Sequence, residues 1–216
     1  ATNQKRNFYN VFSQIRTLLS AKFEIQAGLN YNKTQFELEN YSLNATQNYS
    51  YDAIFSPQLS FLYKPNEQQT VYFSASRGFS LPATEETLTS SGTINPEIKP
   101  ENGYNFEIGG KFYFFNKSLY TELSAYRMQI KDLLVSKRVG NDQYVGINAG
   151  ETLHQGIEMM LNHTTQISQI FTVNSYLAAS LGNYKFQNFE DNGNNYSGNK
   201  LTGVPANKVN AGLSIN

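Results

Sequence analysis

The feature that most limits the fold of this chain is a strict period of two in segment 101–115. One set of alternate residues is apolar or aromatic (Tyr104, Phe106, Ile108, Phe112 and Phe114), and the other set is mostly polar (Asn105, Glu107, Gly109, Lys111 and Tyr113). Successive side chains of a strand point to opposite faces, whereas those of a helix do not. A tilted strand crosses a bilayer with about 9–11 residues. The segment therefore predicts a two-faced strand that is long enough to span a membrane.

Segments of this kind recur along the chain and predict an all-β fold. Strands are expected at 7–18, 23–36, 54–63, 69–79, 101–115, 119–137, 143–166 (with a bend at Gly150), 170–186 and 207–216. Short turns alternate with long polar loops at 37–53, 80–100, 138–143 and 187–206. Outer-membrane barrels have short periplasmic turns and long extracellular loops. The pattern predicts an antiparallel meander of about nine long strands that forms part of a large transmembrane β-barrel.

The composition agrees with the wall of a transmembrane β-barrel. The mean hydropathy is −0.49, and no run of about 18 apolar residues is present that would form a transmembrane helix. A barrel wall keeps a low hydropathy because every second residue faces a polar lumen. The 17 basic and 17 acidic residues leave no net charge, which gives no indication of nucleic-acid binding. The absence of cysteine excludes thiol catalysis and cysteine-based zinc sites.

Catalytic motifs have little support in this sequence. The two histidines, His154 and His163, are an odd number of residues apart, so a regular strand places them on opposite faces and they would not share a metal. Neither a Gly-x-Ser-x-Gly elbow nor a glycine-rich phosphate loop occurs. We therefore expect no enzymatic activity and no cofactor.

Six residues are candidates for contact with a ligand or an internal partner. Glu107, Lys111 and Glu158 are charged residues of predicted strands, and Arg77, Phe79 and Glu85 lie where a strand leaves the membrane. Paired carboxylates can act as the acid and base of a glycosidase, but wet lumen-facing charges, with Lys111 and Arg77 as partners, are the more economical interpretation. The rim residues can equally anchor a loop that Pro82 rigidifies.

Several short motifs occur in a fixed order between residues 55 and 210. They are Ser56-Pro57-Gln58-Leu59-Ser60, the segment Val71 to Pro82 with its Arg-Gly-Phe, Asn95-Pro96-Glu97-Ile98-Lys99-Pro100-Glu101, Tyr104 to Gly109, Tyr126 to Leu134, Asn148 to Glu158, and Leu201 to Lys208. Each motif is weak by itself, but their order and spacing resemble the barrel of TonB-dependent outer-membrane receptors. The last motif departs from the family pattern, since Thr-Gly-Val-Pro replaces a form with two prolines.

The resemblance implies a plugged barrel of the 22-stranded type. Residues 1–216 would be a partial barrel, with the plug domain and the C-terminal strands outside this chain. The implied partners are outer-membrane lipid, a plug domain of the same polypeptide, TonB through the N-terminal region, and an extracellular ligand such as a ferric siderophore or haem. The implied location is the outer membrane of a Gram-negative bacterium.

Two other classes remain open at this stage. One is a porin-like or adhesin barrel without TonB coupling, and the other is a soluble carbohydrate-binding β-sandwich. A sandwich predicts that the aromatic face is buried between two sheets. A barrel fragment instead predicts an open, curved antiparallel sheet with two free edges and an exposed apolar face.

Overall fold

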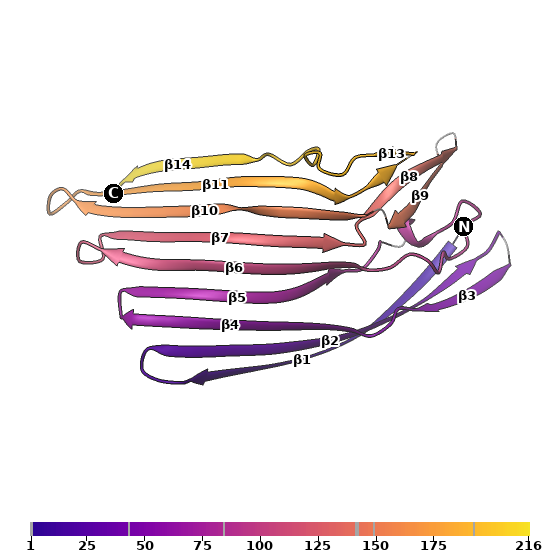
Figure 1. The fold of residues 1–216 in the computed structure, drawn as a ribbon, viewed down its shortest axis with the longest axis horizontal. Helices are drawn as coiled ribbons and strands as arrows, with labels where there is room; N and C mark the ends of the chain where they lie inside the picture. Colours follow the sequence, from indigo (N-terminus) through magenta and orange to yellow (C-terminus); the bar gives the residue numbers. More distant parts are fainter. Residues whose placement is uncertain (1, 43, 84, 141–142, 149, 192) are drawn as a thin grey trace.

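The computed structural model describes residues 2–42, 44–83, 85–140, 143–148, 150–191 and 193–216. Most of the described chain forms one ten-stranded antiparallel sheet (Figure 1). Nine of its strands follow one another in the order β1 (Thr2–Leu18), β2 (Phe23–Asn40), β4 (Ile54–Asn66), β5 (Gln69–Ser80), β6 (Glu101–Phe114), β7 (Leu119–Lys131), β10 (Glu151–Gln166), β11 (Thr172–Asn188) and β14 (Asn207–Ile215). The predicted meander of about nine long strands is confirmed.

Three of the predicted strand and loop boundaries are wrong because strands continue beyond the wall. The sequence predicts a loop at 37–53, but β2 runs on to Asn40 and pairs there with β3 (Ala45–Ser50). The sequence predicts one strand at 119–137, but this segment is divided between β7 and β8 (Leu134–Gly140), with Asp132 at φ 56° between them. Strand β8 pairs with β9 (Gln143–Asn148) as a separate hairpin, and a small hairpin of β12 (Glu190–Asp191) and β13 (Asn194–Asn195) lies in the last long loop.

The strand predicted at 143–166 is divided at its predicted bend, since β9 pairs only in the separate hairpin and β10 joins the wall. Gly150 has φ 91° between β9 and β10, and a Cβ atom built there would lie 1.6 Å from the carbonyl oxygen of Asn188. This position requires glycine for two reasons, since other residues disfavour positive φ and no space exists for a side chain. The bend separates the β8–β9 hairpin from the wall.

The register of the sheet separates an apolar outer face from a polar inner face. One row of paired residues crosses seven strands and is apolar throughout: Ile25, Phe61, Phe73, Ile108, Ala125, Ile157 and Leu181. The neighbouring row, on the other face, reads Glu24, Leu62, Tyr72, Gly109, Ser124, Glu158, Ser180 and Lys208. Large apolar side chains of the outer face are exposed, among them Phe106 at 50% and Ile108 at 56%.

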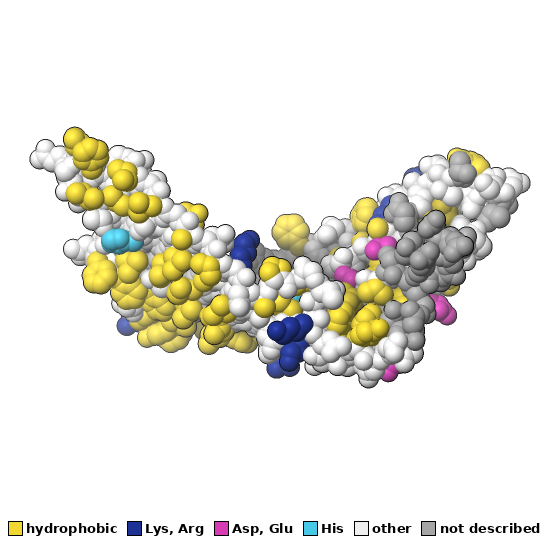
Figure 2. Space-filling view, turned by 90° about the horizontal axis from the view of Figure 1, so that it is seen from above, with side chains coloured by type: hydrophobic (Ala, Val, Ile, Leu, Met, Phe, Trp, Pro, Cys, Tyr) yellow, Lys and Arg dark blue, Asp and Glu magenta, His cyan; other side chains and the backbone are white. Residues whose placement is uncertain are grey.

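The sheet is open and curved. Strands β1 and β14 lie at its two edges, and within the described residues neither edge has a further partner. Figure 2 shows hydrophobic side chains gathered on the convex side, toward the end that carries the short turns. No helix in the described part of the chain is long and apolar enough to cross a membrane. The exposed outer face contradicts a two-sheet sandwich, in which this face would be covered.

The buried hydrophobic side chains of the described chain gather at the end that carries the long loops. They are Phe36, Leu38, Tyr51, Ile54 and Ile98. These residues come from β2, the chain between β3 and β4, the start of β4, and the loop that precedes β6. The wall itself has little enclosed core, because its two faces meet different surroundings. The rim of long loops is therefore the part that folds like a compact globular unit.

Candidate functional site

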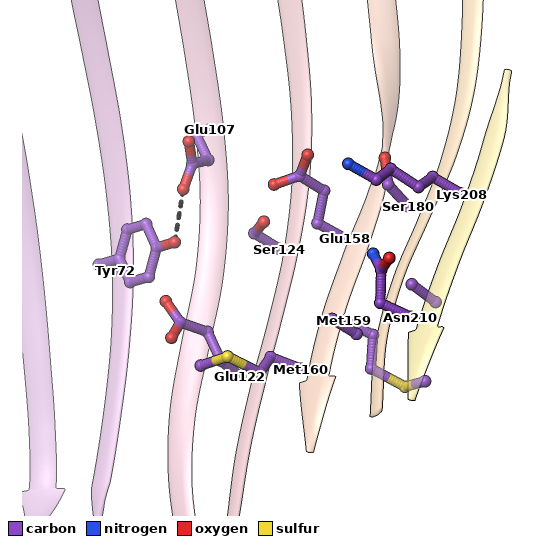
Figure 3. Close-up of a pocket in the computed structure, with 12 residues that line it drawn as sticks. Tyr72, Glu107, Glu122, Ser124, Glu158, Met159, Met160, Ser180, Lys208 and Asn210 are labelled. Carbon is purple, nitrogen blue, oxygen red and sulfur yellow. Dashed lines mark hydrogen bonds between the residues drawn. The ribbon is translucent and has the colours of Figure 1, made fainter. Parts of the chain in front are cut away.

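The concave face of the wall carries a group of polar side chains that share one shallow hollow. Its volume is about 350 Å³, and its charged and phenolic members are Tyr72, Glu107, Glu122, Glu158 and Lys208. These side chains come from five different strands and project from the same face (Figure 3). They meet there because antiparallel pairing places residues of equal parity side by side.

Hydrogen bonds fix two of the three carboxylates in this group. The Tyr72 hydroxyl donates to a Glu107 oxygen at 2.5 Å. Glu122 accepts a hydrogen bond of 2.8 Å from the Tyr120 hydroxyl and lies 3.3 Å from the Lys111 ammonium. Glu158 is exposed, and the Lys208 side chain extends toward it in Figure 3. The site therefore combines three carboxylates and two ammonium groups on a wet surface.

A second charged cluster lies on the same face near the short turns. Glu24 is only 2% exposed and accepts hydrogen bonds from Arg16, Lys64 and Gln26, at distances from 2.6 to 2.9 Å. These partners come from β1, β4 and β2. The cluster ties three neighbouring strands together at this end of the wall.

The long loops form a folded rim above the wall. Loop 81–100 lies over the extended part of β2 and β3, where Ile94 N–H donates to Gln47 Oε1 at 2.8 Å and the Tyr49 hydroxyl donates to the Pro96 carbonyl at 3.0 Å. On its other side, Asn148 of β9 accepts a hydrogen bond from Lys99 N–H at 2.8 Å and donates to the Lys99 carbonyl at 2.9 Å. The loop is thus fixed on both flanks.

Three of the six predicted site residues lie on the concave face. Glu107 is part of the hollow described above, Lys111 pairs with Glu122, and Glu158 stands opposite Ser124 and Ser180. Glu85 begins a short 3₁₀ helix (Glu85–Thr87) in loop 81–100. The first three residues thus share the concave face, and Glu85 lies in the loop between β5 and β6.

Arg77 and Phe79 lie on the outer face instead. Arg77 pairs with Tyr104 and Phe79 with Asn102, which share the outer face with Phe106. The expected pairing of Arg77 with Glu107 or Glu158 is therefore wrong, because the sheet lies between them. Arg77 instead donates to Asn102 Oδ1 at 2.6 Å, and its guanidinium lies 5.7 Å from the Tyr104 ring.

The concave site also contains residues that were not selected from the sequence, namely Tyr72, Glu122 and Lys208. All three lie on the face opposite the apolar row. The alternation of residues along each strand indicated this face in the sequence. What the sequence lacked was the register between strands, which decides that Tyr72 reaches Glu107 and that Lys111 reaches Glu122. The sequence therefore indicated the sheet face of each side chain, but not which side chains contact one another.

The two histidines lie on opposite faces, as their odd spacing predicted. His154 pairs with Tyr184 and shares the concave face, and His163 pairs with Ser175 on the outer face. In the described residues no group of three or more His, Asp or Glu side chains is arranged to hold a metal ion. Charged residues and hydroxyl groups thus define the chemistry of this wall.

The sequence matches the family described as TonB dependent receptor-like, beta-barrel, over residues 1–216. The chain therefore belongs to the β-barrel of TonB-dependent receptors, a family of transporters and receptors. No curated protein matches the chain in sequence.

Solved structures share the fold at low sequence identity. The chain is similar to the FrpB iron transporter from Neisseria meningitidis (18% identity, TM-score 0.65, 92% of this chain and 28% of that one). It is also similar to the siderophore receptor PiuA from Acinetobacter baumannii (20%, TM-score 0.71, 98% and 31%) and to the copper transporter OprC (16%, TM-score 0.71, 96% and 32%). The chain thus spans about a third or less of the length of these proteins.

Proposed function

We propose that this chain forms part of the barrel wall and extracellular rim of a TonB-dependent receptor in the outer membrane of a Gram-negative bacterium. The receptor would import a scarce nutrient, a ferric siderophore or haem. The observation that carries this proposal is the match to the receptor barrel family over residues 1–216. The two-faced wall supports it, since an exposed apolar face suits lipid and a polar face suits a filled lumen.

A plug domain of the same polypeptide would pack against the concave face. Glu107, Lys111 and Glu158 are the proposed contacts, because they project from that face as charged groups. TonB would act on the plug through the N-terminal region of the receptor, outside this chain. This arrangement requires no catalysis by the wall, whose proposed role is to enclose the plug and to hold the loops in position.

The extracellular ligand would bind at the rim of long loops. Loop 81–100 is fixed by hydrogen bonds on both flanks, and it carries Glu85 at the start of its 3₁₀ helix. A fixed loop loses less conformational entropy on binding than a mobile one. Since Arg77 and Phe79 lie on the outer face, they would support the rim rather than contact the plug.

Transport assays test this function. A strain that lacks the gene should grow poorly when a ferric siderophore or haem is the sole iron source, and the complete gene should restore growth. Uptake of radioactive iron should also stop when TonB is deleted. If uptake is unchanged without TonB, the protein is a passive porin-like channel instead. Iron-independent growth combined with loss of copper uptake would overturn the proposed substrate class.

The plug contact is tested by the double variant Glu107→Gln/Glu158→Gln. Removal of two lumen charges should reduce TonB-dependent uptake several-fold, at equal amounts of folded receptor in the membrane. Glu67→Gln removes an exposed charge from the short turn between β4 and β5 and serves as the control. Equal uptake by the double variant and wild type would show that these carboxylates do not hold the plug.

A further inference from the structure

We propose that the imported ligand leaves the lumen along one uncharged sector of the concave face, and that this sector suits a ferric siderophore rather than haem. The sector is the short-turn end of β10, β11 and β14, and we call it the exit sector. This inference rests on the proposed function, because it requires a plug and a moving ligand inside the barrel. The concave side chains that line the exit sector are Asn162, Thr164, Asn174, Tyr176 and Ser214, with Gly212 between them.

The exit sector is a continuous hollow across three neighbouring strands. Its volume is about 470 Å³, and its strands follow one another in the sheet (Figure 1). The register sets Thr164 beside Asn174, and Asn174 beside Ser214. Paired residues of an antiparallel sheet share a face. These three residues have the same parity along their strands as Glu158, Ser180 and Lys208, so they project into the lumen.

No charged side chain lies on the concave side of this sector. Within the six residues nearest the short-turn end, the concave positions of the three strands are all neutral: Asn162, Thr164, Gln166, Thr172, Asn174, Tyr176, Asn210, Gly212 and Ser214.

The other wall strands differ at the same end. Strands β1, β2, β4, β6 and β7 each carry a charged residue on the concave face there, and β5 carries Tyr72, which donates a hydrogen bond to Glu107. The five charged residues are Arg16, Glu24, Lys64, Lys111 and Glu122.

The polar groups of the exit sector are largely unoccupied. Thr164 Oγ1 donates to Asn174 Oδ1 at 2.9 Å. In the part of the chain that the structure describes, the Asn162 amide and the Tyr176 hydroxyl make no hydrogen bond with another residue. The charged strands differ, since Lys111 lies 3.3 Å from Glu122 and Glu24 is saturated by its partners. The exit sector therefore offers free donors and acceptors, whereas the rest of this end is already paired.

A neutral sector suits movement of a ligand along the wall. A passage must bind its cargo well enough to admit it and weakly enough to release it, over several sites in succession. Hydrogen bonds between neutral groups are weaker than those to charged groups. Charged strands would hold the plug more firmly than this sector does. The plug would therefore separate from the wall most easily along β10, β11 and β14.

The lining of the sector favours one class of ligand. Amide and hydroxyl groups match the hydroxyl and carbonyl oxygens on the surface of a ferric siderophore. The ring of Tyr176 lies over Gly212, where any side chain would collide with it. The other concave residues of the hollow present no large aliphatic side chain. An apolar macrocycle such as haem would thus gain little by burial there.

A bulky residue in the exit sector tests this path in cells that carry the full-length receptor. Radioactive iron is offered as its citrate, hydroxamate and catecholate complexes, and the complex that wild type imports is the probe. In Asn174→Trp we expect unchanged binding of the probe at the cell surface, and a maximal uptake rate about fivefold lower or less, because the added ring narrows the passage. Ser60→Trp adds the same ring to the concave face of β4 and should leave both quantities unchanged.

A second variant adds no bulk. Asn162→Ala/Asn174→Ala removes two amides from the hollow, and we expect the uptake rate to fall about two- to threefold because two of the successive weak sites are lost. Heat-dependent migration on gels confirms that each variant is folded, and the double variant tests the path if Asn174→Trp does not fold.

Three results would overturn the exit sector. They are wild-type uptake rates in the folded exit-sector variants, equal losses in Asn174→Trp and Ser60→Trp, and import of haem but of none of the three iron complexes by wild type. The proposed function has a separate readout, which is the dependence of wild-type uptake on TonB. A receptor that imports the probe with TonB, and equally well in all variants, refutes only the path.

Discussion

Arg16 of β1 donates two hydrogen bonds to Glu24 of β2, from Nε at 2.6 Å and from Nη2 at 2.7 Å. The guanidinium side chain is 61% exposed and the carboxylate side chain 2% exposed. Lys64 of β4 reaches the same carboxylate at 2.9 Å. One buried acid thus connects three consecutive strands at the end of the wall that carries the short turns.

Replacement of this acid should loosen that end of the wall. In Glu24→Gln the cations of Arg16 and Lys64 lose their charged partner, and we expect the unfolding temperature of the folded receptor to fall by several degrees. Heat-dependent migration on gels measures this temperature. Glu67→Gln, in the neighbouring turn, should have no effect. An unchanged temperature for Glu24→Gln would show that the cluster contributes little.

Adjacent alanines of β11 provide a direct test of the two faces. Ala178 pairs with Asn210 and lines the concave side, whereas Ala179 pairs with Val209 and faces outward. Arginine facing lipid near mid-depth costs about 2–4 kcal/mol, and the cost is much smaller in a wet lumen. We therefore expect Ala179→Arg to lower the free energy of unfolding by about that amount. Denaturant unfolding in lipid vesicles measures the difference.

The control in this comparison is Ala178→Arg, which adds the same side chain one residue away. It should fold and insert almost as well as wild type. The two-faced assignment fails if Ala178→Arg is as destabilising as Ala179→Arg, or if the order of the two is reversed.

Asn148 fixes loop 81–100 to the β8–β9 hairpin. Its side chain accepts from Lys99 N–H and donates to the carbonyls of Lys99 and Asp132 at 2.9 and 2.7 Å. Each such hydrogen bond contributes about 0.5–1.5 kcal/mol. In Asn148→Ala we expect hydrogen exchange of amides 92–99 to accelerate about tenfold or more. Asn194→Ala in the exposed β13 should leave these amides unchanged, and slow exchange in both variants would contradict the role of Asn148.

Two tyrosines of the rim should respond differently to loss of the hydroxyl. Tyr49 donates to the Pro96 carbonyl at 3.0 Å, so Tyr49→Phe should destabilise the rim by about 1 kcal/mol. The Tyr51 hydroxyl is buried and has no hydrogen-bond partner among the described residues, so Tyr51→Phe should be neutral or stabilising. Proteolysis of the rim in purified receptor compares the two. A larger loss in Tyr51→Phe would contradict this ranking.

Alkaline pH should loosen the rim through the same tyrosine. Burial raises the pKa of Tyr51 to about 12, whereas the unfolded side chain has a pKa of about 10. The folded rim thus retains a proton that the unfolded chain releases, so its stability is complete below pH 10 and falls as the pH rises toward 12. Protease sensitivity between pH 9 and 11 measures the effect. Tyr51→Phe should remove part of it, and an identical profile in the variant would refute the assignment.

The sequence predicted the wall well and the rim poorly. Residues Phe106 and Glu107 could be assigned to opposite faces because a strand alternates its side chains locally. The order of the nine strands followed from the same periodicity and from the turns between them. Loop 37–53 was misjudged because its hairpin packs against loop 81–100, about 45 residues further along the chain, and such contacts leave no periodic signal.

The candidate site was also predictable from the sequence only in part. The sequence alone determined the nine strands of the wall, the two faces, and the family that the order of motifs resembles, because each of these depends on local pattern and spacing. Only the tertiary structure decided which side chains meet. Register joins Tyr72 to Glu107, moves Arg77 to the outer face and sets Lys185 opposite Lys200. Register is a relation between distant segments, and a shift of one residue would exchange every face.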